Sequence, residues 1–94
     1  MIKSFADRDT ERLFLGQIPK KLPNDIWRRA ARKLLVINAA EELMELTVPP
    51  GNRLEKLTGN RVGQHSIRVN DQWRICFRWQ DGNAYEVEIT DYHN

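Results

Sequence analysis

The side chains best suited to chemistry are two arginines and three residues near the end of the sequence, namely Arg68, Arg74, Asp91, Tyr92 and His93. Histidine accepts or donates a proton near neutral pH, and arginine stabilises the charge that develops on a reacting phosphate. Tyrosine stacks on unpaired bases. Together these groups suit metal-free cleavage of RNA, in which the ribose 2′-hydroxyl attacks the adjacent phosphate and an acid protonates the 5′-oxygen that leaves.

A second acid–base candidate is Glu55, which lies between Arg53 and Lys56. An ordinary surface position on a strand is the alternative interpretation of this glutamate. The segment from residue 53 to residue 78 has an excess of basic residues, which favours contact with an anion such as RNA. The basic residues expected to make that contact are Arg53, Lys56, Arg61, Arg68 and Arg78.

Other chemistries have weaker support. His65 and His93 are the only histidines, and no carboxylates have the spacing of metal ligands, so we expect neither a metal site nor a cofactor. Cys76 has no histidine predicted beside it, which favours a half-buried cysteine over a nucleophile. His65 shares the apolar face of a predicted strand with Ile67 and is expected to be partly buried.

Alternating apolar and polar residues predict the strands that must position these groups. The predicted strands span residues 53–57, 64–69, 73–79 and 85–89, with a weaker one at 1–5. Residues 70–72 and 81–83 have turn composition, and each is expected to form a three-residue turn. One face of this sheet is apolar, with Tyr85 among its members, and must be covered by helices.

The register expected from these turns brings the candidate residues together. The first turn pairs Arg68 with Arg74, and the second pairs Arg78 with Glu86 and Arg74 with Thr90. Like charges directly opposite each other are unfavourable, and the row of Arg68 and Arg74 contains no acid. A bound phosphate would stabilise that pair, whereas Arg78 has a structural partner in Glu86.

Two helices are predicted before the sheet. Asp7 can cap a first helix that continues to Gly16, and Asn24 or Asp25 can cap a longer one. The apolar positions of the second helix recur at steps of three and four residues: Ile26, Trp27, Ala30, Ala31, Leu34 and Leu35. Its basic residues Arg28, Arg29, Arg32 and Lys33 fall on the opposite face, so we interpret them as its solvent side. The predicted fold class is therefore α+β, with two helices on one face of a four- to five-stranded, mainly antiparallel sheet.

The composition fits one small domain. The 94 residues are 40% hydrophobic and 30% charged with a net charge of +2, and we expect a single domain over residues 1–94. No apolar run approaches the ~18 residues that span a bilayer, and the first residues lack the apolar core of a signal peptide. With one cysteine, the sequence predicts a cytoplasmic protein without a membrane partner.

Taken together, several segments resemble the HigB toxin family of the RelE/ParE toxin–antitoxin superfamily, and the resemblance covers nearly the whole chain. Within that family the sequence is most similar to the GraT-like branch. The segments are Pro50-Gly51-Asn52-Arg53-Leu54-Glu55, Ser66-Ile67-Arg68-Val69, Trp73-Arg74-Ile75-x-Phe77 and Val87-x-Ile89-x-Asp91-Tyr92-His93. The resemblance implies a RelE-like fold and a ribosome-dependent endonuclease that cuts translated mRNA in the A site.

The resemblance also implies partners and residue roles. The toxin would be neutralised by a HigA-type helix-turn-helix antitoxin, and only the complex with that antitoxin would bind operator DNA. Arg74 matches the active-site arginine of the family, and Asp91, Tyr92 and His93 match its terminal active-site triplet. Several members have histidine where this chain has Glu55, so either Glu55 replaces that histidine as proton acceptor or His93 works nearly alone.

Two other functions stay open from the sequence. One is a non-enzymatic inhibitor of a topoisomerase, as in the ParE branch, and the other is a plain RNA- or ribosome-binding module. An inhibitor that acts by binding alone does not need the grouping of Arg68, Arg74 and His93, so the sequence favours the RNA-cleaving toxin.

Overall fold

The computed structural model describes residues 1–91. Two α-helices precede a four-stranded sheet, and short 3-10 turns lie at Asn24–Ile26, Leu43–Thr47, Pro50–Asn52 and Gly59–Arg61. The helices and strands are α1 (Arg8–Phe14), α2 (Trp27–Ala39), β1 (Glu55–Lys56), β2 (His65–Arg68), β3 (Arg74–Gln80) and β4 (Asn83–Thr90).

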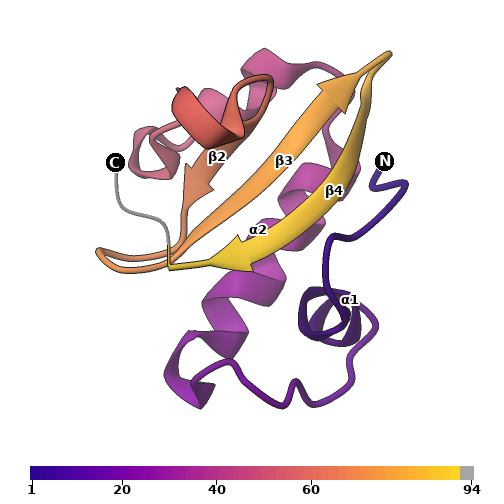
Figure 1. Cartoon of the computed structure of the whole chain (residues 1–94), viewed down its shortest axis with the longest axis vertical. Coiled ribbons are helices and arrows are strands. Elements are labelled where there is room, and N and C mark those ends of the chain that lie inside the picture. The colour runs from indigo at the N-terminus through magenta and orange to yellow at the C-terminus, as the bar shows by residue number, and fades with distance from the viewer. Residues whose placement is uncertain (92–94) are drawn as a thin grey trace.

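The sheet has the order β1-β2-β3-β4, and each neighbouring pair is antiparallel. Both α-helices lie on one face of it, with α2 behind the sheet in Figure 1. The core forms between that face and the helices and includes Leu34 and Ile37 of α2 and Phe77 of β3, all fully buried. The predicted α+β class is confirmed, with four strands.

The predicted cap of the first helix is confirmed, whereas the predicted cap of the second is wrong. Asn24 and Asp25 lie in the 3-10 turn before α2, and the residue at the N-cap of α2 is Ile26, which makes no side-chain capping bond. Asp7 caps α1 by accepting a hydrogen bond from the backbone N–H of Thr10 at 3.3 Å. In α2 the buried positions are Ala30, Leu34 and Ile37, at steps of four and three residues. Leu35, predicted on the same face, is 59% exposed because it lies one residue, or about 100° of helix, beyond the buried stripe.

The predicted strand at residues 1–5 does not join the sheet as a strand. It makes two isolated parallel bridges to the outer edge of β4, Ile2 with Ala84 and Phe5 with Val87. This segment therefore covers the edge of β4. At the opposite edge, β1 is shorter than the predicted strand 53–57, because Arg53 has a left-handed backbone with φ of 45°.

The β3–β4 hairpin differs from the predicted one at its tip. Gln80 pairs with Asn83, so the turn contains two residues, whereas the sequence predicts three at 81–83. A bulge follows in which Glu86 has φ of 53°, and it adds the residue that the turn lacks. Beyond the bulge the register is therefore the predicted one.

This bulge has two consequences for side chains near the tip. Ala84 and Val87 both enter the core, while Tyr85 is only partly buried and lies outside the core cluster. The prediction that Tyr85 belongs to the core face is thus wrong. Arg78 pairs through its backbone with Tyr85, yet its side chain still reaches the Glu86 carboxylate at 2.6 Å, so the predicted ion pair is confirmed.

The outer face of the sheet is not open to solvent along its whole length. Ser66 and Cys76 are fully buried, so Cys76 is more deeply buried than the half-buried position predicted for it, and Leu57 is only 2% exposed. The turn at Gly59–Arg61 lies in front of β2 in Figure 1, on the opposite side from α2. The side chain of Arg78 approaches the same segment, because a Cβ atom at Gly63 would lie 2.7 Å from Arg78 Nη1.

Candidate functional site

Arg74 begins β3 and is held in one orientation by two neighbouring segments. Its Nε donates to Ser66 Oγ at 2.8 Å, and its Nη2 donates to the backbone carbonyl of Arg53 at 2.7 Å. The side chain is only 13% exposed. Within residues 1–91 no acceptor bonds its Nη1, so the guanidinium keeps one nitrogen for a ligand while the rest is fixed.

The carboxylate of Glu55 lies beside this guanidinium. β1 pairs Glu55 with Ser66, and this register places the carboxylate 3.8 Å from Arg74 Nη2. Glu55 is 44% exposed, which makes it accessible to a substrate. The structure therefore brings a partly exposed acid and a nearly buried, preoriented cation together at one end of the sheet. Such a pair can move a proton and stabilise a phosphate.

The end of β4 lies beside Arg74. Thr90 pairs with Arg74 across the hairpin, as the sequence predicts. Asp91 follows directly and accepts a hydrogen bond from Gln72 Nε2 at 3.0 Å. Tyr92 and His93, the other two candidates of this segment, lie outside the residues that the structure describes.

The side chains of Arg68 and Arg74 each lie near a carboxylate. The two residues are backbone partners, as predicted, but each side chain has its own carboxylate. Arg68 bonds Asp71 in the turn between β2 and β3, and Arg74 lies near Glu55. The row of Arg68, Arg74 and Thr90 contains no acid, as predicted, but carboxylates approach both arginines from outside that row. Phosphate binding by the pair stays a prediction.

The remaining basic candidates differ in how firmly they are held. Arg61 reaches Glu88 and Gln64, both at 3.1 Å, and so links the 3-10 turn before β2 to β4. Arg53 and Lys56 are exposed, and both lie within two residues of Glu55 in the sequence. Arg78 is also exposed, but its guanidinium is paired with Glu86, so Arg53 and Lys56 are the candidates most accessible to RNA.

His65 and Cys76 do not have the environment of catalytic groups. Burial and the positive charge of Lys56 lower the pKa of His65, whose ring stacks on Phe77 at 6.3 Å. Its Nδ1 is buried without a hydrogen-bond partner among the described residues. Burial raises the pKa of the Cys76 thiol, so the unreactive protonated form is favoured.

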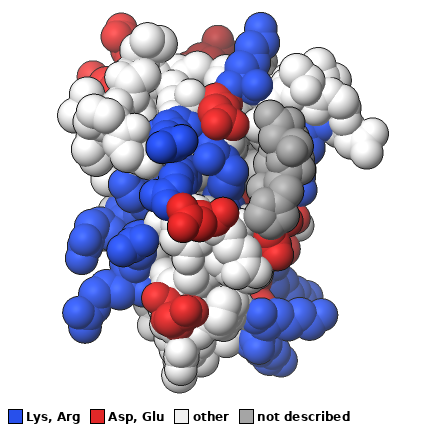
Figure 2. Space-filling view, turned by 90° about the vertical axis from the view of Figure 1, so that its left-hand side faces the viewer, with Lys and Arg blue, Asp and Glu red and all other residues white. Residues whose placement is uncertain are grey.

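Sequence reasoning missed two groups of functional interest. No sequence pattern marks a role for Ser66, whose hydroxyl orients Arg74. The cations of α2 were interpreted as a solvent side, yet Arg29, Arg32 and Lys33 line a hollow together with Arg68. Only the fold places these segments side by side. Figure 2 shows lysine and arginine side chains gathered in the middle and at the left of one face of the molecule.

Comparison with known proteins identifies the family. The family described as "RelE-like toxin of type II toxin-antitoxin system HigB" matches residues 3–93. The chain belongs to the HigB family of RelE-like toxins. It is 41% identical to Toxin HigB-1 of Vibrio cholerae over 98% of each chain. It is also 36% identical to Endoribonuclease HigB of Proteus vulgaris, over 99% of this chain and 100% of that protein.

Solved structures agree on the fold of this HigB chain. The YoeB–YefM complex of Staphylococcus aureus superimposes with a TM-score of 0.60 at 18% identity, over 100% of this chain and 99% of the matched chain. A YoeB dimer from the same organism gives a TM-score of 0.57 at 20% identity, over 99% of this chain and 98% of that one. At this identity the likeness concerns the fold alone.

As a member of a toxin–antitoxin family, this HigB chain has an antitoxin as partner. Placement in the GraT-like branch stays a prediction. Among residues 1–91 no helix is long and apolar enough to cross a membrane. The same residues contain no group of three or more His, Cys, Asp and Glu side chains that could hold a metal ion.

Proposed function

We propose that this chain is a ribosome-dependent endonuclease that cleaves translated mRNA in the A site. The observation that carries the proposal is the preoriented guanidinium of Arg74 beside the Glu55 carboxylate. The similarity to a protein named Endoribonuclease HigB supports the same reaction class. A protein that acts by binding alone has no need for a cation fixed by two hydrogen bonds and an acid beside it.

The proposed reaction is a transesterification on the RNA itself. A base removes the proton of the ribose 2′-hydroxyl, and the 2′-oxygen bonds to the adjacent phosphorus. The bond from phosphorus to the 5′-oxygen breaks, and an acid returns a proton to that oxygen. Arg74 stabilises the extra negative charge on the phosphate in the transition state, which is the step where a preorganised cation contributes most.

The two proton transfers need two groups, and Glu55 and His93 are the candidates. Glu55 is positioned for the 2′-hydroxyl because it lies 3.8 Å from the phosphate-binding arginine. The family resemblance implies that Tyr92 and His93 belong to the active-site triplet. We assign protonation of the leaving oxygen to His93 and stacking on a base to Tyr92. Asp91 would orient this segment through Gln72. If Glu55 only holds Arg74, His93 performs the chemistry nearly alone.

The proposed partners follow from the same family. They are the 70S ribosome with its mRNA and a HigA-type helix-turn-helix antitoxin, whose complex with this chain binds operator DNA. The accessible basic residues Arg53 and Lys56 would contact RNA beside the Arg74–Glu55 pair. A protein that works on ribosomes is expected in the cytoplasm.

Mapping of 5′ ends on a defined mRNA tests the proposal. The purified protein is incubated with that mRNA with and without translating ribosomes. We expect cuts only with ribosomes and in the codon frame. Absence of cuts under both conditions, in a preparation that still arrests growth, would contradict the proposal and favour an inhibitor of the ParE type.

The variant His93→Ala tests the chemistry separately from binding. We expect it to lose cleavage and toxicity while its affinity for ribosomes is retained. Glu55→Gln keeps the shape of the side chain but removes its charge. Positioned acid–base groups contribute about 10²–10⁴-fold in rate, so a loss in that range assigns Glu55 as the proton acceptor. Full cleavage by this variant would leave Glu55 with a structural role.

A further inference from the structure

A basic groove lies between α2, the turn that contains Pro49 and Gly51, and the end of β2. We use the name basic groove for the hollow of about 480 Å³ lined by Arg29, Arg32 and Lys33 of α2 and by Arg68 of β2. None of the groups that anchor Arg74 lines it. The groove is therefore a second cationic site, adjacent to the Arg74–Glu55 pair because Arg68 and Arg74 are paired across β2 and β3.

The positive charge of the basic groove is not neutralised from within. No carboxylate among residues 1–91 lines it, and the partner of Arg68 is Asp71, whose side chain is 99% exposed at the turn. Lys33 bonds the side-chain oxygen of Asn52, and Arg29 bonds the carbonyl of Val69 at 3.3 Å. These neutral acceptors hold the cations in place without cancelling their charge.

Lys33 is partly buried among the other cations of the basic groove. Burial and the charges of Arg29, Arg32 and Arg68 together lower the pKa of this lysine. Four cations held this close cost free energy unless an anion joins them. Arginine forks match the oxygens of a phosphate, so a phosphate ester is the anion that this arrangement suits best.

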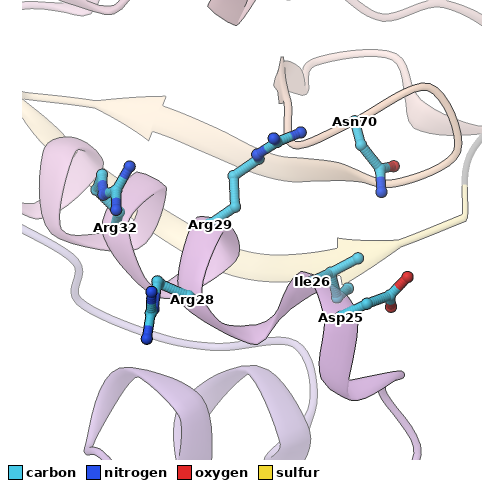
Figure 3. A pocket seen from close by; sticks show the side chains of 6 residues that line it. All are labelled: Asp25, Ile26, Arg28, Arg29, Arg32 and Asn70. Carbon is cyan, nitrogen blue, oxygen red and sulfur yellow. The ribbon is translucent and has the colours of Figure 1, made fainter.

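The basic groove continues into a neighbouring hollow of about 310 Å³ that shares Arg29 and Arg32 with it. Figure 3 shows Arg29 extending from α2 toward the loop that carries Asn70. Asp25, in the 3-10 turn before α2, contributes one carboxylate to this hollow, against the three cations of Arg28, Arg29 and Arg32. The two hollows follow the 3-10 turn and α2 from residue 25 to residue 36, a distance of about 16 Å at the helical rise per residue. That length accommodates more than one phosphate of a polyanion.

We propose that the basic groove binds the phosphate backbone of RNA that is not cut, next to the segment held at Arg74. The proposal rests on the proposed function, since it assigns a further RNA contact to the same enzyme. An acidic protein segment is the less favoured occupant, because protein interfaces are centred on apolar and aromatic anchors. The large apolar side chains exposed on this molecule, such as Leu35 and Met44, do not line the groove.

The test compares two triple variants that remove the same charge. The groove variant is Arg29→Gln, Arg32→Gln and Arg68→Gln, and the matched control is Arg8→Gln, Lys20→Gln and Lys21→Gln, whose exposed side chains lie outside the groove. Affinity is measured against a labelled RNA oligomer blocked at its 2′-oxygens, vacant 70S ribosomes and ribosomes carrying mRNA. Affinity for the antitoxin is measured in parallel.

Counterion release gives the expected size of the effect. Each phosphate contact on a single strand contributes about 0.7 to the slope of log affinity against log salt. Three lost contacts therefore lower that slope by about 2 and the affinity by about 100-fold at 0.1 M salt. The control is expected to stay within a few-fold of the unsubstituted chain. Loss on vacant ribosomes assigns the groove to ribosomal RNA, and loss only with mRNA present assigns it to mRNA.

Unchanged RNA and ribosome affinity in the groove variant would overturn the proposal, as would a loss of antitoxin affinity alone. Asp71→Asn provides a second variant that leaves the groove residues intact and frees Arg68. We expect it to bind RNA more tightly, and weaker binding would count against the groove. If the unsubstituted chain cleaves mRNA while the groove variant binds normally, the groove is wrong and the proposed function stands. If the unsubstituted chain neither binds nor cleaves, the proposed function itself fails.

Discussion

Replacement of Arg74 by lysine tests whether the geometry of the guanidinium, and not only its charge, is required. Arg74 uses Nε for Ser66 and Nη2 for the carbonyl of Arg53, and it still has a further nitrogen for phosphate. A lysine ammonium is a single nitrogen that cannot bond both anchors and meet a phosphate in the same orientation. Arg74→Lys therefore keeps the positive charge but loses the preorganised donor.

The expected fall in cleavage rate can be estimated from other enzymes in which a preorganised donor was removed. Removal of one preorganised donor at a reacting oxyanion lowers the rate about 10²–10³-fold, or roughly 3–4 kcal/mol in activation free energy. We expect Arg74→Lys to fall in this range. Ser66→Ala removes only one anchor of Arg74, so its loss should be smaller and should appear in the rate at saturation more than in the affinity.

Single-turnover cleavage of mRNA on programmed ribosomes, with the protein in excess, measures the chemical step apart from binding. Arg12→Lys is the matched control, because Arg12 pairs with Asp9 in α1 and lies outside the site. The control should cleave at the rate of the unsubstituted chain. A rate for Arg74→Lys close to that of the control would refute the reasoning, since charge alone would then suffice.

Three further predictions concern stability. Gly63→Ala should lose about 1–2 kcal/mol in urea unfolding, because Gly63 has φ of 89°, a backbone conformation that strains alanine. The Arg78 Nη1 that would lie 2.7 Å from the added Cβ is the end of a flexible side chain and can move away. Gly51→Ala meets nothing within 4 Å and should be nearly neutral. The pKa of His65 is lowered in the folded chain, so its neutral form stabilises the fold fully above the ordinary pKa of 6.5. This stabilisation is lost as the pH falls below 6.5. The midpoint of thermal unfolding should therefore fall between pH 7 and pH 5, and His65→Phe should make that fall smaller. Asp9→Asn should cost about 2–3 kcal/mol in the same urea assay, since the buried carboxylate accepts two backbone N–H groups; an unchanged midpoint would contradict this role.

Much of the fold could be predicted because its signals are local. The Asp7 cap located α1, the three- and four-residue spacing located α2, and alternation located β2, β3 and β4. The hairpin shows the limit of such reasoning. A two-residue turn and a bulge at Glu86 replace the predicted three-residue turn, and the two differences cancel toward Arg74 and Thr90. The sequence alone contains no clear signal for that bulge, so Tyr85 was placed on the wrong face.

The candidate site was only partly predictable, because its geometry depends on contacts between segments. Strand parity and register were enough to bring Arg74 to Thr90. Parity and register could not predict that the Glu55 carboxylate lies 3.8 Å from Arg74 Nη2, because the two residues of β1 are too few to define its register from the sequence. Likewise, helical periodicity places Lys33 away from the core, but it cannot show that the end of β2 lies against the same face of α2.

The position of β4 between the N-terminal segment and β3 has a consequence for synthesis. Ser4 accepts a hydrogen bond from the backbone N–H of Glu86, 82 residues later, and Thr10 accepts one from Ile89, 79 residues later. Contacts so distant in sequence form late, because a long loop must close first. A nascent chain therefore keeps its first segment undocked until residues 83–90 have left the ribosomal tunnel. The same strand completes both the fold and the Arg74 end of the hairpin, so an unfinished toxin should be unable to cut the message from which it is being made.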